Sequence, residues 1–145
     1  MTLGTRLLCV FYALVALAAL YGTWSENLAY FGPGAHGGGG RFLPDLKVNP
    51  ASRSFAIDLG LFLLAAAVWM VREARKLGIR FVWVYIVMAF AIAISVTFPL
   101  FLLAREHRLA SGKPVPAAGP VTRALDLVGL AALTAASVGF GLWLH

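Results

Sequence analysis

The chain has 145 residues, of which 61% are hydrophobic and only 12% are charged. Soluble domains carry about a quarter charged residues, so this composition excludes an ordinary water-soluble domain. The apolar residues form blocks close to the roughly 20 residues that a helix needs to cross a bilayer, which predicts an integral membrane protein. Twelve Lys and Arg stand against six Asp and Glu. Because these cations gather at the ends of apolar blocks, they indicate topology signals and headgroup contacts rather than nucleic acid.

The first apolar block predicts a helix over about residues 5–24. The cation Arg6, the apolar run and its small residues also fit a secretory signal peptide, so cleavage is an alternative. Tyr21 and Trp24 favour a retained helix, because amphipathic aromatic residues gather at membrane interfaces. The next stretch, 25–50, predicts a glycine-rich loop, because a helix loses stability at each glycine.

Two further helices are predicted over about residues 51–72 and 80–104, joined by a turn with four positive charges in nine residues. Proline suits the first turn of a helix, so Asn49-Pro50 indicates where the earlier one begins. A polar, proline-containing linker leads to a last predicted helix over about 122–144. The sequence therefore predicts one all-α domain over residues 1–145, a polytopic bundle of four transmembrane helices.

Positive residues near helix ends predict the orientation, because they favour the cytoplasmic side. The dense basic turn favours a cytoplasmic position, which would place both termini in the cytoplasm and the protein in the inner membrane. With four crossings, however, five Lys and Arg lie inside and seven outside. The prediction therefore depends on the density of charge in the shortest loop.

Residues 49–106 carry a resemblance to a known family. The motifs that carry it are NPASRSFAIDL, then W-x3-EARKLGIR, then VWVYI and S-x3-PLFLLARE. This stretch resembles the bacterial membrane-protein family called domain of unknown function 2834, and the first helix matches by position and type. The resemblance implies a small helical inner-membrane protein of about three spans, without an assigned activity. The glycine-rich loop and the extra C-terminal helix depart from the family pattern.

Asp58 is the residue that most strongly indicates a site, because a carboxylate inside a spanning segment is costly and often functional. Its structural interpretation is a partner for a nearby cation or hydroxyl, favoured by the negative charge lying near a helix N-terminus. Its functional interpretation is a proton-binding or substrate-orienting group. An antiparallel third helix would bring further polar residues level with it, which predicts an outward-facing polar pocket; its members are Asp58, Ser95, Thr97, Arg105 and Asp126. The alternative is that each charge only caps its own helix end.

Small residues recur every four positions at Ala131, Ala135 and Gly139, a spacing that suits close contact between membrane helices. Such a face fits another helix of the chain, a second copy in a homo-oligomer, or a membrane-protein partner. The single cysteine and the isolated histidines give no paired ligand motif, so no metal and no cofactor are predicted.

Three functions follow from these observations. The first is a non-enzymatic bundle that interacts with a partner protein or binds a lipid-like ligand, with membrane lipids as its surroundings. The second is a small transporter or channel-like subunit, which needs a polar path through the bilayer. The third is a membrane enzyme acting on a hydrophobic substrate, with Asp58 or Asp126 as general acid, which needs a carboxyl of raised pKa facing a cavity.

Overall fold

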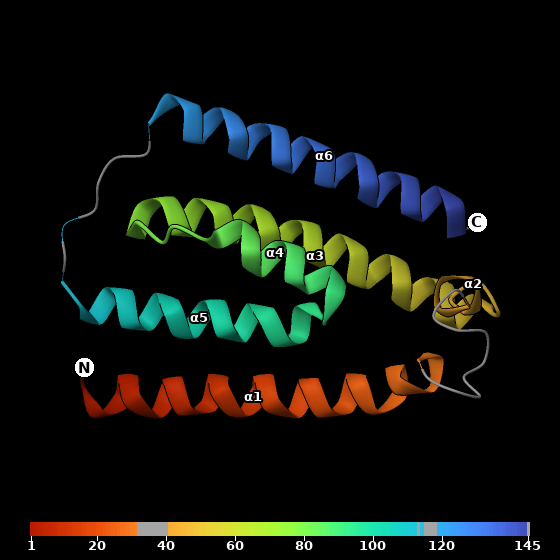
Figure 1. Ribbon diagram of the computed structural model, residues 1–145, viewed down its shortest axis with the longest axis horizontal. Coiled ribbons are helices and arrows are strands. Elements are labelled where there is room, and N and C mark those ends of the chain that lie inside the picture. Colours follow the sequence, from red (N-terminus) through yellow and green to blue (C-terminus); the bar gives the residue numbers. More distant parts are fainter. Residues whose placement is uncertain (32–40, 113, 115–118, 145) are drawn as a thin grey trace.

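The computed structural model describes residues 1–31, 41–112, 114 and 119–144, and Figure 1 shows their arrangement. The described elements are α1 (Leu3–Asn27), η1 (Leu28–Tyr30), α2 (Phe42–Asp45), α3 (Pro50–Leu77), α4 (Val82–Ala91), α5 (Ile94–Ala110) and α6 (Pro120–Leu144). The predicted all-α class is confirmed for this part of the chain. The glycine-rich run within 32–40 lies outside the described residues, as does Lys113.

Three of the described segments are long and apolar enough to cross a membrane: Leu3–Tyr30, Pro50–Leu77 and Pro120–Leu144. They correspond to the first, second and fourth predicted helices. The predicted loop 25–50 is partly helical, since α1 continues to Asn27 and two short helical turns follow. The fourth crossing is not confirmed, because the third predicted helix is divided in two.

Both ends of α3 are capped by residues that suit a helix end. The Asn49 side chain accepts a hydrogen bond from the Ser52 N–H at 2.8 Å, and Pro50 occupies the first turn, as predicted. At the other end Gly78 is left-handed (φ 69°) and its N–H donates to the Ala74 carbonyl. The basic residues of the last turn face the negative end of the helix dipole. The helix therefore continues to Leu77, five residues beyond its predicted end.

The predicted helix over 80–104 is instead a helical hairpin. Helix α4 ends at Ala91, Ala93 has an extended backbone (φ 173°, ψ 147°), and α5 then runs back alongside α4 (Figure 1). Around this reversal the chain is rich in β-branched residues, which have lower helix propensity, and Pro99 cannot donate a helical hydrogen bond to Ser95. With ten residues, α4 extends about 15 Å, half the thickness of a bilayer core.

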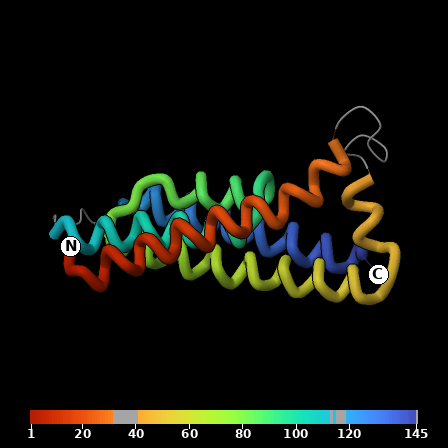
Figure 2. The backbone as a smooth tube through the Cα atoms, turned by 90° about the horizontal axis from the view of Figure 1, so that it is seen from below, coloured from red at the N-terminus to blue at the C-terminus, as the bar shows by residue number. Residues whose placement is uncertain are grey.

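The helices form an elongated bundle in which α1 packs along α5, and α6 packs along α3 (Figures 1 and 2). The core lies where α3, α4, α5 and α6 meet; its buried members are Ala67, Met70, Val71, Ala74, Val82, Ile86, Phe101 and Leu133. A second cluster packs Ile94, at the start of α5, against Leu63 and Ala66 of α3. The hairpin therefore returns beside the inner half of α3, and its tip lies about level with Leu63.

Candidate functional site

Most of the cations gather at one end of the bundle. The N-terminus, the end of α3, the end of α5 and the start of α6 all lie there, on the left of Figure 1. Eight described cations belong to this basic end: Arg6, Arg72, Arg75, Lys76, Arg80, Arg105, Arg108 and Arg123. The opposite end, called the outer end below, carries three: Arg41, Lys47 and Arg53. The hairpin causes this asymmetry, because it returns the end of α5 and the start of α6 to the basic turn.

An ion pair at the basic end joins α3 to α6. Arg75 holds the Asp126 carboxylate with two hydrogen bonds, from Nε at 2.6 Å and from Nη2 at 2.7 Å. The Trp83 indole Nε1 of α4 donates to the same carboxylate at 3.0 Å. Asp126 is buried, with 6% of its surface exposed. Such two-pronged guanidinium contacts fix geometry as well as charge, so this triad positions α6 against the hairpin.

Close packing supports the triad from the next turn of α6. Gly129 lies against the Trp83 ring, and a Cβ added there would be 2.4 Å from Trp83 Cη2 and 2.5 Å from Cζ2. Only a residue without a side chain allows the indole to lie this close to α6. The ring can therefore reach Asp126 because position 129 is glycine.

A second charge network joins α3 to α5. Arg105 donates from Nε to Glu73 at 2.8 Å and from Nη1 to Glu106 at 2.6 Å. The hydrogen bond to Glu73 raises the pKa of Arg105, and the charges of both carboxylates add to this effect. Nearby, Arg108 Nε donates to the Leu77 carbonyl at 2.6 Å, at the C-terminal end of α3. These contacts fix the end of the hairpin to the basic turn.

The structure divides the five residues of the predicted polar pocket between different depths. Arg105 and Asp126 lie at the basic end, whereas Asp58 is 15 residues before Glu73 on α3, about 22 Å along the helix axis. Asp58 is exposed, and no described residue forms an ion pair or hydrogen bond with it.

The other two residues of that pocket lie near the hairpin tip. Ser95 is exposed, and Thr97 is buried with its hydroxyl donating to the Ala93 carbonyl of its own helix at 3.3 Å. The predicted convergence of the five residues is therefore wrong. Its physical reason is the reversal at Ala93, which carries the later part of the chain back to the basic end instead of on to the outer end.

Sequence reasoning missed the partners of both charge networks, namely Glu73, Arg75 and Trp83. Glu73 also has a looser contact with Lys76, three residues further along α3, at 3.8 Å. The spacing of Glu73 and Arg75 in the sequence could have indicated that they contact different helices. Residues two apart on a helix point in nearly opposite directions, so this pair can face two different helices.

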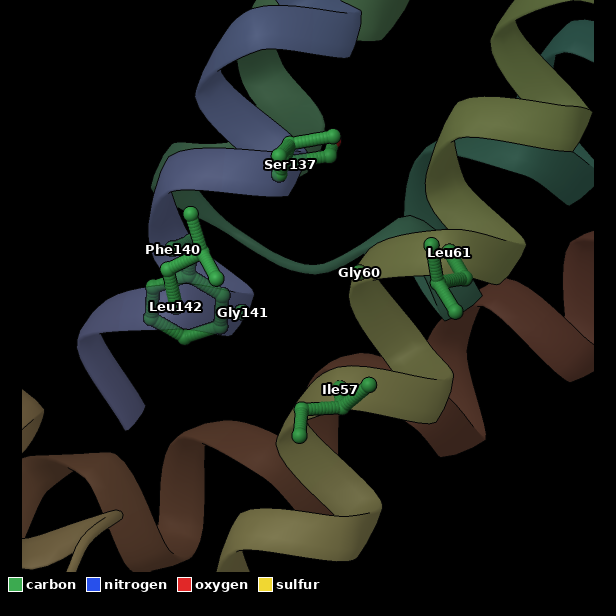
Figure 3. Close-up of a pocket in the computed structure, with 8 residues that line it drawn as sticks. Ile57, Gly60, Leu61, Ser137, Phe140, Gly141 and Leu142 are labelled. Carbon is green, nitrogen blue, oxygen red and sulfur yellow. The ribbon is translucent and has the colours of Figure 1, made fainter. Parts of the chain in front are cut away.

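An apolar groove lies between α3 and α6 towards the outer end (Figure 3). Its volume is about 220 Å³, and its lining consists of Ile57, Gly60, Leu61, Ser137, Val138, Phe140, Gly141 and Leu142. Gly60, Ser137 and Gly141 are small, and their missing side-chain volume creates the hollow. The groove therefore lies between two helices that are long and apolar enough to cross a bilayer.

Two cations lie at the outer end of this groove. Arg53 precedes Ile57 by one helical turn on the same face of α3, and its Nη1 donates to the Lys47 carbonyl at 3.0 Å. The Lys47 ammonium lies over the Trp143 ring, 4.5 Å from its centroid, and donates to the Trp143 carbonyl at the end of α6. These contacts bring positive charge to the outer end of the groove.

The small-residue stripe of α6 does not pack within the chain, since Ala131, Ala135 and Gly139 are all exposed. Helix α6 instead meets its neighbours through Asp126, Gly129 and Leu133, on a different side of the helix. Among the described residues no group of three or more His, Cys, Asp or Glu side chains is placed to hold a metal ion.

Together these features define a class of protein: a small all-helical protein with three candidate membrane spans. At one end of its bundle, ion pairs join α3 to α6 and α3 to α5. A family model described as "Protein of unknown function DUF2834" matches residues 11–107, about two thirds of the chain. The chain belongs to this family. The match begins within α1, includes α3 and α4 and ends within α5, and α6 lies beyond it. No curated protein and no solved structure matches the chain.

Proposed function

We propose that the protein is a non-catalytic membrane bundle that binds a lipid-like molecule in the groove between α3 and α6. The observation that carries this proposal is the groove itself, an apolar hollow between two helices that are long and apolar enough to cross a bilayer. Its proposed occupant is an acyl chain, because hydrocarbon surrounds the middle of helices that cross a bilayer. The hollow gives the chain contacts on several sides, whereas a smooth helix face gives contacts on one side only.

The geometry of the two aspartates favours this function over the enzyme alternative. A general acid needs a carboxyl that faces a cavity and is free to exchange a proton. Asp126 is buried under Arg75 and Trp83, whose hydrogen bonds occupy both carboxylate oxygens, so it does not face a cavity. Asp58 lies on an exposed face of α3 rather than in a cavity. The transport alternative has no comparable support, because the groove lining is almost entirely apolar.

Filling the groove tests the proposal. In Gly141→Leu the new side chain enters the hollow, where no atom lies within 4 Å of the added Cβ, and we expect at least a fivefold loss of lipid labelling at the groove. The probe is a phospholipid with a photoactivatable diazirine on its acyl chain, incorporated into vesicles with the full chain. Peptide mass spectrometry then measures labelling at groove residues such as Ile57 and Val138.

Gly139→Leu is the matched control, because Gly139 is an exposed glycine of the same helix with no atom within 4 Å of an added Cβ. We expect its labelling at the groove to equal that of the natural protein. Equal labelling in Gly141→Leu and Gly139→Leu would contradict the proposal, since the hollow would then be no better a site than any lipid-facing surface.

We further propose how the bundle lies in the membrane. The prediction of four crossings placed both termini in the cytoplasm, whereas the hairpin supports three crossings plus a re-entrant segment that penetrates about half the bilayer. The basic end, with eight of the eleven described cations, then faces the cytoplasm of an inner membrane. The N-terminus lies at this end and the C-terminus at the other (Figure 1).

Cysteine labelling distinguishes the two arrangements. In a Cys9→Ala background, we expect Ser111→Cys to react with a membrane-impermeant maleimide only after cells are permeabilised. A cysteine appended after the last residue will react in intact spheroplasts. Four crossings give the reverse pattern at both positions, so the reverse pattern would contradict the re-entrant arrangement.

A further inference from the structure

We infer that an exposed face of α3 at the basic end binds an anionic phospholipid, with Arg72 and Lys76 on its phosphate and Trp69 beside its acyl chain. This lipid site lies at the opposite end of α3 from the groove. It therefore does not depend on the lipid proposed for the groove, and the two sites can be tested separately.

The carboxylates of the basic end are all bound within the bundle. The chain has six acidic side chains, and three of them lie at this end: Glu73, Glu106 and Asp126. Arg75 binds Asp126, and Arg105 binds both glutamates. The eight described cations of the basic end exceed these three carboxylates by five positive charges. An anionic lipid headgroup is the partner that complements this excess, because clusters of cations beside a membrane attract anionic lipids.

Arg72 and Lys76 place two of these charges side by side. Both residues are exposed, and they lie four positions apart on α3. Residues at this spacing are neighbours on a helix surface, so their like charges repel each other. Glu73 contacts Lys76 at 3.8 Å through Oε2, but its Oε1 is bound by Arg105. A phosphate between the two cations relieves the repulsion, because its charged oxygens accept strong hydrogen bonds from both.

The length of α3 places these cations near the lipid headgroups. Its 28 residues extend about 42 Å, whereas the hydrocarbon core of a bilayer is about 30 Å thick. A centred helix therefore extends about 6 Å, or one turn, beyond the core at each end. Lys76 lies in that last turn. Arg72 lies one turn before it, and its long side chain can extend outwards to the headgroups while its stem stays in apolar surroundings.

Trp69 provides the apolar part of the lipid site. It lies three residues before Arg72 on the same side of α3, and 40% of its surface is exposed. Its ring centroid lies 5.7 Å from that of Phe98 and 6.0 Å from that of Phe101, so the packing of α5 fixes its position. Trp69 lies deeper along α3 than the two cations. A phospholipid has the same order of groups, with its acyl chains deeper than its phosphate.

Photolabelling in vesicles tests the inference on the full chain. The probes are phosphatidylglycerol and phosphatidylcholine with a diazirine on the acyl chain close to the headgroup, and peptide mass spectrometry measures labelling around Trp69. Both lipids have a phosphate, but the choline cation leaves phosphatidylcholine without net charge. We expect about fivefold more labelling by phosphatidylglycerol, which corresponds to about 1 kcal/mol, the contribution of one cation near an anionic surface. Arg72→Gln with Lys76→Gln will reduce this ratio to about one.

Two further variants separate the lipid site from the general charge of the basic end. Arg72→Lys with Lys76→Arg keeps both charges, and we expect it to retain the fivefold ratio. Arg6→Gln with Arg123→Gln is the matched control, because it removes two exposed cations of the basic end from α1 and α6. We expect this control to retain the ratio as well. The inference is overturned if the natural protein shows no preference, if the glutamine variant of Arg72 and Lys76 keeps it, or if the control loses it equally.

Discussion

Replacing Asp126 with alanine will loosen α6 from the basic end and lower the free energy of unfolding by about 3 kcal/mol, because breaking a buried ion pair leaves its partner unpaired. The expected loss has two sources in the structure. Arg75 loses both hydrogen bonds of its guanidinium, and the Trp83 indole N–H loses its acceptor. Both groups would then remain at the interface between α3 and α6 without the carboxylate that satisfies them.

Thermal unfolding of the purified protein in mild detergent measures this loss. Glu26→Ala is the control, because Glu26 is an exposed carboxylate outside both charge networks, and we expect little change there. A double variant, Arg75→Met with Asp126→Leu, removes both charges together and should regain most of the stability, since apolar replacements of buried ion pairs are often neutral. Equal stability of Asp126→Ala and Glu26→Ala would show that the triad does not hold α6.

The helices that could be predicted from sequence are those whose local signals agree. The second predicted helix begins at Asn49-Pro50 as expected, because an N-cap side chain and a first-turn proline act within one turn of chain. The ends of such helices shift by a few residues, as at Leu77, because the basic turn contains no helix breaker before Gly78. The positions of α1 and α6 could also be predicted, because each is a continuous apolar block and such a block is a local signal.

The hairpin could not be predicted in this way. Composition alone makes residues 80–104 resemble one long apolar helix, and the only strong breaker in it is Pro99, which lies inside α5 rather than at the reversal. The reversal at Ala93 is favoured by contacts distant in sequence: Ile94 packs on Leu63 and Ala66, and Arg105 binds Glu73. Hydrophobic periodicity contains no information about such contacts.

The unpredicted hairpin is also the reason why the predicted polar pocket does not form. A straight third helix carries Arg105 to the depth of Asp58, whereas the hairpin carries it to Glu73. The charges then satisfy one another at the basic end, and Asp58 has no partner among the described residues. The groove itself depends on which faces of α3 and α6 meet, and small residues at Gly60 and Gly141 do not specify that pairing by themselves.

Gly129→Ala will destabilise the protein by about 2 kcal/mol, although alanine is the better helix former by about 1 kcal/mol. The new methyl group would lie 2.4 Å from Trp83 Cη2 and 2.5 Å from Cζ2, closer than carbon atoms can approach. The indole cannot move aside freely, because its N–H is hydrogen-bonded to Asp126. Either the ring leaves that carboxylate or α6 shifts away from the hairpin, and both responses weaken the packing of α6.

Gly139→Ala is the matched control on the same helix, since an added Cβ there has no atom within 4 Å. We expect it to be neutral or slightly stabilising, so the same substitution should have opposite effects ten residues apart. Thermal unfolding of Gly129→Ala, Trp83→Leu and the double variant gives the coupling between the two positions. The loss in the double variant should be smaller than the sum of the two single losses, because leucine removes the atoms with which the methyl group collides. Simple additivity would mean that α6 does not pack on Trp83 through Gly129.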